Sequence, residues 1–167
     1  YTLNNNIDSI ENYLNVDRAL WYLAVNSCIL NADTYSLVNV RNYYLYQTEN
    51  GQFQIIPWDV SESFIGALTF WWGDVENLYE ASPYFGYDPY IEDRPLLYGL
   101  LQVDSYRKIY DAHIRTIMND FINTTYFEDA VEELGNIAYN SAQDDPNPIF
   151  LDGFQSNVNE NYWFWDQ

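Results

Sequence analysis

Two short β-rich runs joined by an Asn-Gly turn are the feature that most constrains how this chain folds. Residues 42–47 and 53–57 are rich in tyrosine, isoleucine and phenylalanine, and Asn50 and Gly51 lie between them. Asn-Gly is the pair that most readily accepts the positive φ angles of a tight turn. The sequence therefore predicts an antiparallel β-hairpin.

Two aspartates flank this hairpin. Asp33 precedes the first strand and Asp59 follows the second. Carboxylate oxygens are hard ligands suited to Mg²⁺ or Ca²⁺, and two of them at strand ends can hold a cation against a polyphosphate. The pattern indicates metal-assisted phosphoryl transfer. Two structural interpretations stay open: Asp33 caps a turn after the preceding helix, and Asp59 is an N-cap.

Three sequence blocks resemble a known family. They are NVDRALWYLAVNSCILNAD with NYYLYQTENGQFQIIPWDVSESF, then EDRPLL, then DSYRKIY, and they span roughly residues 13 to 125. In this order they are similar to the core, the "RPL" helix and the following tyrosine- and arginine-bearing helix of the CotH kinase family. Members of that family are atypical protein kinases first associated with spore coats.

The resemblance implies a role for each candidate residue. Asp33 matches the catalytic-loop aspartate, which orients or deprotonates the attacking hydroxyl, and it also lies near the metal. Asp59 matches the aspartate that binds the metal bridging the nucleotide phosphates. Asn42, or else Asn39, supplies a neutral oxygen ligand, although a purely structural role for Asn42 at the strand start stays open. The implied cofactors are ATP and Mg²⁺, or another divalent cation such as Ca²⁺ or Mn²⁺.

The chain also departs from a complete kinase. Its seven glycines are scattered and form no glycine-rich phosphate loop, and its only lysine, Lys108, lies in a predicted helix of the second half. Kinase chemistry needs a cover over the phosphates and a lysine that reaches them. We therefore interpret residues 1–167 as the C-terminal portion of a single CotH-like kinase domain whose N-terminal lobe is absent, a fragment expected to be nearly inactive alone.

The predicted fold is mainly α with a small antiparallel β-hairpin, an α+β class that resembles the C-terminal lobe of a protein-kinase-like fold. Apolar spacing and capping residues predict the helices. These span residues 17–30 with Asn15 as the cap, 95–101 starting at Pro95, 105–121, and 128–142. A long ordered loop over residues 61–90 is expected near the site.

The charge and aromatic content of the chain limit the classes of partner that it can bind. The chain has 25 acidic and 6 basic residues, a net charge of −19, and this acidity argues against nucleic acid and anionic membranes. No apolar run is long enough to cross a membrane. Aromatic residues make up 19% of the chain, and they either pack the core or stack on sugars or a partner.

The single cysteine and the single histidine do not indicate a further reactive or metal-binding site. A single cysteine, Cys28, excludes an internal disulfide and fits a small core residue. The single histidine, His113, fits a helix face and has no neighbour at zinc-ligand spacing.

Two functions follow from the sequence. The first is phosphotransfer from ATP to a protein hydroxyl. The alternative is a non-catalytic secreted or surface module for adhesion, coat assembly or carbohydrate binding. Both fit an extracytoplasmic protein whose partner is a protein substrate, a surface or coat protein, or a carbohydrate.

Overall fold

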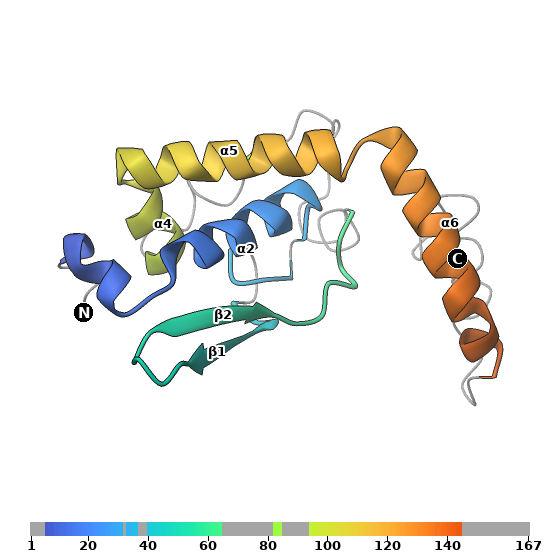
Figure 1. The fold of residues 1–167 in the computed structure, drawn as a ribbon, viewed down its shortest axis with the longest axis horizontal. Helices are drawn as coiled ribbons and strands as arrows, with labels where there is room; N and C mark the ends of the chain where they lie inside the picture. Colours follow the sequence, from blue (N-terminus) through green and yellow to red (C-terminus); the bar gives the residue numbers. More distant parts are fainter. Residues whose placement is uncertain (1–5, 32, 37–39, 65–81, 85–93, 145–167) are drawn as a thin grey trace. The chain divides into compact units, whose positions relative to one another are not determined.

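The computed structural model describes residues 6–31, 33–36, 40–64, 82–84 and 94–144. The chain forms two compact units, residues 1–117 and 118–167. Its elements, coloured along the chain in Figure 1, are the 3₁₀ helix η1 (Ile7–Asn12), α2 (Val16–Cys28), β1 (Tyr43–Gln47), β2 (Phe53–Pro57), α4 (Pro95–Leu101), α5 (Asp104–Asp120) and α6 (Thr124–Gln143). The predicted α+β class, mainly helical with one antiparallel hairpin, is confirmed.

Helix α2 is the centre of the first unit. Its predicted cap is confirmed, since the Asn15 side chain accepts a hydrogen bond from the backbone N–H of Arg18 at 3.1 Å. Ala19, Leu20 and Leu23 repeat at helical spacing and are fully buried. Burying a leucine side chain stabilises a fold by about 1.5–3 kcal/mol. Figure 1 shows α2 lying between α5 on one side and the hairpin on the other.

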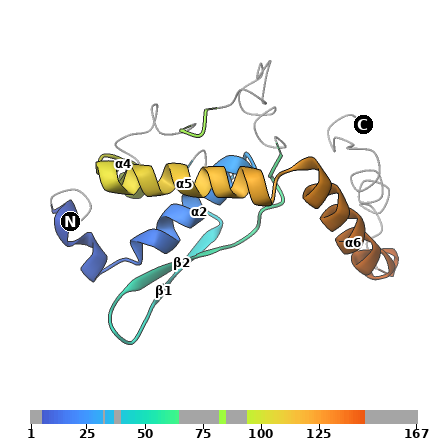
Figure 2. The same ribbon diagram turned by 45° about the horizontal axis from the view of Figure 1, so that its top comes forward.

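The hairpin has the predicted strands and turn. Tyr43 pairs with Pro57 and Gln47 pairs with Phe53 at the two ends of the antiparallel register. Gly51 adopts a φ of +85°, the conformation for which a residue without a Cβ is favoured. Ile55 is buried, and its carbonyl accepts a hydrogen bond from the Arg18 side chain at 3.0 Å. In Figures 1 and 2, β2 lies between α2 and β1.

Helices α4 and α5 close the other side of α2. Pro95 occupies the first turn of α4, where its missing N–H costs nothing. The His113 ring of α5 stacks on the Trp21 ring of α2 with centroids 3.8 Å apart, and its Nε2 lies 2.9 Å from an Asp17 carboxylate oxygen. The single histidine therefore joins two helices, in agreement with its predicted place on a helix face.

The second unit contains α6. This helix starts at Thr124 rather than at the predicted Glu128, because the Asn123 side chain accepts a hydrogen bond from the Tyr126 N–H and caps the first turn. Leu134 and Ile137 are exposed on it. No helix among the described residues is both long enough and apolar enough to span a membrane. Most of the loop predicted over residues 61–90 lies outside the described residues.

Candidate functional site

The segment that carries Asp33 is a buried loop. It follows the end of α2, and Asn31, Asp33 and Thr34 are all less than a tenth exposed. Loops normally run over the surface because buried backbone polar groups need partners inside the protein. The hydrogen bonds of this loop are therefore what positions Asp33.

A chain of asparagine contacts links Asp33 to α2. The Asn26 amide donates to the Tyr22 carbonyl at 2.8 Å, and the Asn31 amide donates to the Asn26 side-chain oxygen at 2.9 Å. The Asn31 side-chain oxygen in turn accepts from the Asp33 N–H at 3.2 Å. Because each amide both donates and accepts, the last turns of α2 fix the backbone at Asp33.

Two buried tyrosines hold the rest of the loop. The hydroxyls of Tyr22 and Thr34 lie 2.6 Å apart, and the Tyr35 hydroxyl accepts a hydrogen bond at 2.8 Å from the N–H of Leu96 in the first turn of α4. Burial raises the pKa of Tyr22, and it raises the pKa of Tyr35 to about 12. Both side chains therefore serve as neutral structural groups at physiological pH.

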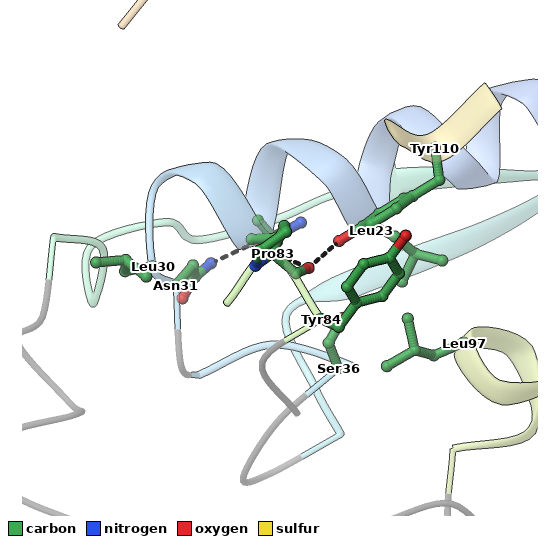
Figure 3. A pocket seen from close by; sticks show the side chains of 10 residues that line it. Leu23, Leu30, Asn31, Ser36, Pro83, Tyr84, Leu97 and Tyr110 are labelled. Atoms are coloured by element: carbon green, nitrogen blue, oxygen red, sulfur yellow. Dashed lines mark hydrogen bonds between the residues drawn. The ribbon is translucent and has the colours of Figure 1, made fainter. Parts of the chain in front are cut away.

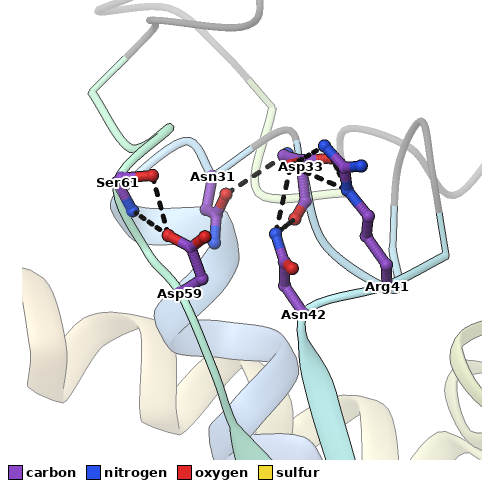
Figure 4. A network of polar contacts seen from close by, with 6 residues as sticks. All are labelled: Asn31, Asp33, Arg41, Asn42, Asp59 and Ser61. Carbon is purple, nitrogen blue, oxygen red and sulfur yellow. Dashed lines mark hydrogen bonds and ion pairs between the residues drawn. The ribbon is translucent and has the colours of Figure 1, made fainter.

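The Asp33 carboxylate binds Arg41. The Arg41 Nε lies 2.9 and 3.0 Å from the two carboxylate oxygens, and its Nη2 lies 2.6 Å from Oδ2 (Figure 4). The Arg41 side chain is 61% exposed, whereas that of Asp33 is 8% exposed. Hydrogen bonding to Asp33 raises the pKa of Arg41. The arginine neutralises the buried acid from the solvent side.

Asn42 reinforces this arrangement. Its amide nitrogen donates to the Asp33 carbonyl at 2.8 Å and to the Asp33 carboxylate at 3.1 Å. Because the nitrogen faces Asp33, the predicted role of Asn42 as an oxygen ligand rests on its remaining side-chain oxygen. Asn39, the other residue considered for that role, lies outside the described residues.

Asp59 lies in a different environment. It is exposed after β2, and its Oδ1 accepts hydrogen bonds from the Ser61 N–H at 3.1 Å and the Ser61 hydroxyl at 2.7 Å. These bonds lower the pKa of Asp59, and Arg41 lowers it further, while the charge of Asp33 raises it. The contact to a backbone N–H two residues ahead is an Asx-type turn, close to the capping role that the sequence left open.

Unusual backbone conformations surround the two aspartates. In the part of the chain that the structure describes, five non-glycine residues have positive φ: Leu30, Val40, Asn42, Asp59 and Phe64. Asn and Asp tolerate this region, but a β-branched valine adopts it at a cost. Residues held in such conformations tend to gather at functional sites. Here they all fall in the segments next to Asp33 and Asp59.

The structure brings the predicted residues together at one end of the hairpin. The Trp58 N–H donates to the Asn42 carbonyl at 3.0 Å, which extends the strand pairing toward Asp59. Figure 4 shows Asp33, Asn42 and Asp59 clustered there, with Arg41 and Asn31 beside them. Sequence reasoning missed Arg41, although a scarce basic residue next to Asn42 was a usable signal.

A closed protein cage for a metal is not formed by this cluster. Among the described residues, no group of three or more histidine, cysteine or acidic side chains has metal-binding geometry. Mg²⁺, however, commonly takes only one or two carboxylates and completes its shell with phosphates and water. Both Asp33 carboxylate oxygens bond to Arg41, so the oxygens of the cluster that could reach a cation held with a polyphosphate are those of the exposed Asp59 and the side-chain oxygen of Asn42.

A small cavity lies beside the last turns of α2, between these turns and residues of α4 and α5 (Figure 3). Its volume is about 10 Å³, and it is lined by Leu23, Asn26, Ser27, Leu30, Asn31, Ser36, Pro83, Tyr84, Leu97 and Tyr110. This volume is about that of one water molecule. The cavity is far too small for a nucleotide base.

The chain belongs to the CotH kinase family. The family model, described as CotH kinase protein, matches residues 2–160. This match confirms the resemblance read from the three sequence blocks and supports kinase-like chemistry at the level of the family. No curated protein and no solved structure matches the chain. The resemblance to the C-terminal lobe of a protein kinase stays a prediction.

Proposed function

We propose that this chain transfers the γ-phosphoryl group of ATP to a protein hydroxyl, with Asp33 and Asp59 in separate roles. The observation that carries the proposal is the placement of both acids at one end of the hairpin, with Arg41 near enough to influence both. Positioning and electrostatic stabilisation account for most of the catalysis of phosphoryl transfer.

Asp33 is the residue we assign to the attacking hydroxyl. Its buried loop and its bonds from Asn42 fix the carboxylate, as general base catalysis requires. Arg41 covers the same carboxylate but is largely exposed, so its side chain is able to move aside. We assign Arg41 as a positioning residue that holds the Asp33 carboxylate in place until substrate arrives.

Asp59 is the residue we assign to the divalent cation. Its lowered pKa keeps the carboxylate ionised at any physiological pH, and its exposure leaves it open to solvent-borne ligands. A cation bound there would neutralise charge on the nucleotide phosphates. Asn42, or Asn39, is the neighbouring amide assigned to the same shell.

The groups that cover the phosphates are assigned to an N-terminal lobe. We propose that residues 1–167 are the C-terminal portion of one kinase domain, because the only lysine, Lys108, lies on α5 rather than on a strand. Without the lysine and the loop that cradle the phosphates, transfer by this portion is expected to be slow.

The test measures nucleotide binding and transfer separately. Calorimetry with ATP and Mg²⁺ is expected to show binding by the wild type, at least about tenfold weaker binding by Asp59→Asn, and unchanged binding by Asp33→Asn. Phosphate transfer to a serine peptide is expected to be lost in Asp33→Asn. Asp129→Asn on α6 makes the same change of charge at an exposed site and is the control. Equal binding by the wild type and Asp59→Asn would remove Asp59 from the metal role.

A second function is favoured by exposed rings on the hairpin. Tyr44 and Trp58 are both more than half exposed, and their rings meet edge to face with centroids 5.5 Å apart. Tyrosine and tryptophan rings join an apolar face to a polar group and are enriched at interfaces, so we assign this pair to contact with a sugar or a partner. A non-catalytic, extracytoplasmic surface module predicts binding to cell-wall polysaccharide that Trp58→Ala abolishes and Asp59→Asn leaves intact.

A further inference from the structure

The two edges of the hairpin differ in how their backbone groups are used. On the outer edge of β2, the Phe53 N–H donates to the Tyr13 carbonyl at 2.7 Å, and the Asn15 N–H donates to the Phe53 carbonyl at 2.9 Å. The Ile55 carbonyl accepts from Arg18. Pro57 has no N–H to offer. On the outer edge of β2, the backbone groups of Phe53 and the carbonyl of Ile55 therefore already have partners.

Along the outer edge of β1, the described residues make no backbone hydrogen bonds. The bonds from Thr48 N–H to Gln52 and from Trp58 N–H to Asn42 identify the residue pairs that exchange hydrogen bonds across the ribbon. These pairs alternate along an antiparallel ladder. By that alternation and the observed register, Tyr43, Leu45 and Gln47 direct their N–H and C=O groups away from β2. In the described part of the chain, these backbone groups have no hydrogen-bond partner.

Nothing in the sequence of β1 protects this edge. Natural sheet edges usually carry charged residues, proline or a bulge, which prevent pairing with another chain. β1 reads Tyr-Tyr-Leu-Tyr-Gln, without a charge or a proline, and it pairs with β2 without a bulge. All of its residues after Tyr43 are exposed. A row of free N–H and C=O groups at strand spacing is complementary to one kind of ligand, an extended peptide backbone.

The net charge of the chain indicates which kind of peptide would bind at this edge. With 25 acidic against 6 basic residues, a second copy of this chain is repelled and a basic segment is attracted. Acidic side chains also lie at both ends of the edge. Glu49 is exposed in the turn at one end, and at the other end Asp59 and Glu62 outnumber the exposed Arg41, which is paired with Asp33. The strand between them is neutral, so apolar side chains of the ligand have a surface to pack against.

We propose that the β1 edge binds an extended, basic segment of a partner protein, which adds as a third strand to the hairpin. Asn42 directly precedes β1 and its amide holds Asp33, so a strand laid along β1 extends toward the Asp33 carboxylate. If the proposed function holds, this bound segment carries the hydroxyl that accepts the phosphoryl group. Strand addition itself does not depend on it.

The binding test uses a short synthetic peptide that alternates lysine and valine around one serine. Hydrogen exchange followed by NMR is expected to show slowed exchange at the amides of Tyr43, Leu45 and Gln47 when the peptide is added. A counterpart with glutamate in place of lysine is expected to bind at least about tenfold more weakly, because both molecules are then acidic.

Variants at one position separate the edge from the rest of the hairpin. Leu45→Pro removes an outward N–H but no bond between β1 and β2, and it is expected to weaken peptide binding about tenfold. Leu45→Lys keeps the N–H and places a repelling charge at the edge, so it tests the same site if the proline variant fails to fold. Ile137→Lys, on exposed α6, changes the net charge equally and is expected to bind as the wild type does.

Three outcomes would overturn strand addition. They are unchanged exchange along β1, equal peptide binding by wild type and Leu45→Lys, and self-association through β1 seen by ultracentrifugation without peptide. A different result would contradict the proposed function alone. In that result the peptide slows exchange along β1 but receives no phosphate, even when an N-terminal lobe is added. Strand addition would then be supported and phosphotransfer contradicted. If phosphate transfer is equally fast in the wild type and in Leu45→Lys, the proposed function is supported, but the β1 edge has no part in binding the acceptor.

Discussion

The segment that carries Asp33 and the segment that carries Asp59 reach the same end of the hairpin by opposite means. Residues 33–36 are all buried, and the side chains of Thr34 and Tyr35 bond to α2 and α4. Residues 58–61 are exposed, and Asp59 is held by a left-handed backbone and by the neighbouring Ser61. One acid is positioned by the core, and the other is positioned by local geometry.

The two acids therefore differ in how strongly each is coupled to the core of the first unit. A change near Asp33 disturbs buried polar groups, so its cost is felt by the whole first unit. A change near Asp59 alters a solvated turn, so we expect it to have little effect on folding. Three variants test this difference in coupling, beginning with the two buried positions.

Asn31→Ala is expected to be the most damaging. Asn31 is 1% exposed, and its loss leaves both the Asn26 side-chain oxygen and the Asp33 N–H without their partner. An unsatisfied buried group costs about 1–3 kcal/mol, so the free energy of unfolding measured in urea should fall by about 2–3 kcal/mol. Asn136→Ala, an exposed change on α6, is the control and should stay within about 0.5 kcal/mol of the wild type. A fall of less than about 1 kcal/mol would contradict a core-fixed Asp33.

Tyr22→Phe is expected to have an intermediate effect. It leaves the Thr34 hydroxyl, which is fully buried, without its partner at 2.6 Å. The free energy of unfolding should fall by about 1–2 kcal/mol. Combining it with Thr34→Val should restore part of this loss, because the two polar groups are then removed together. Strict additivity in a double-mutant cycle would show that the two hydroxyls do not interact.

Ser61→Ala is expected to have the smallest effect on stability and a clear effect on titration. The lowered pKa of Asp59 adds stability at pH values above the unfolded-state pKa, and this contribution is lost as the pH falls through the folded-state pKa, below about pH 4. Removing the Ser61 hydroxyl should raise the pKa of Asp59 toward its ordinary value, observed by carbon NMR of the carboxyl group. The stability at neutral pH should change by less than about 0.5 kcal/mol, as is usual for exposed groups. An unchanged pKa would show that the hydroxyl does not hold Asp59.

Much of this arrangement was predictable from local sequence signals. The Asn50-Gly51 turn and the two β-rich runs define a hairpin, and Asn15 and Pro95 mark the starts of α2 and α4. These features depend on residues that are neighbours in the chain. Because an antiparallel hairpin returns to its starting point, the closeness of Asn42 to the segment of Asp59 followed as well.

The contacts that hold Asp33 were not predictable in the same way. The pairing of Arg41 with Asp33 depends on the path of a loop that has no periodicity, and the Asn26–Asn31 contact is a buried polar bond that apolar patterning does not encode. The early start of α6 was missed because Asn123 was not read as a cap, although its side chain serves as one.

The packing of the single histidine against Trp21 makes the molecule easy to monitor. A chain with one imidazole gives a single set of ring-carbon proton signals, which need no isotope labelling to assign. Because the ring lies stacked over an indole, the circulating π electrons of Trp21 displace those signals from their free positions. Their return to free values would report, in unlabelled protein, the moment when α2 and α5 separate.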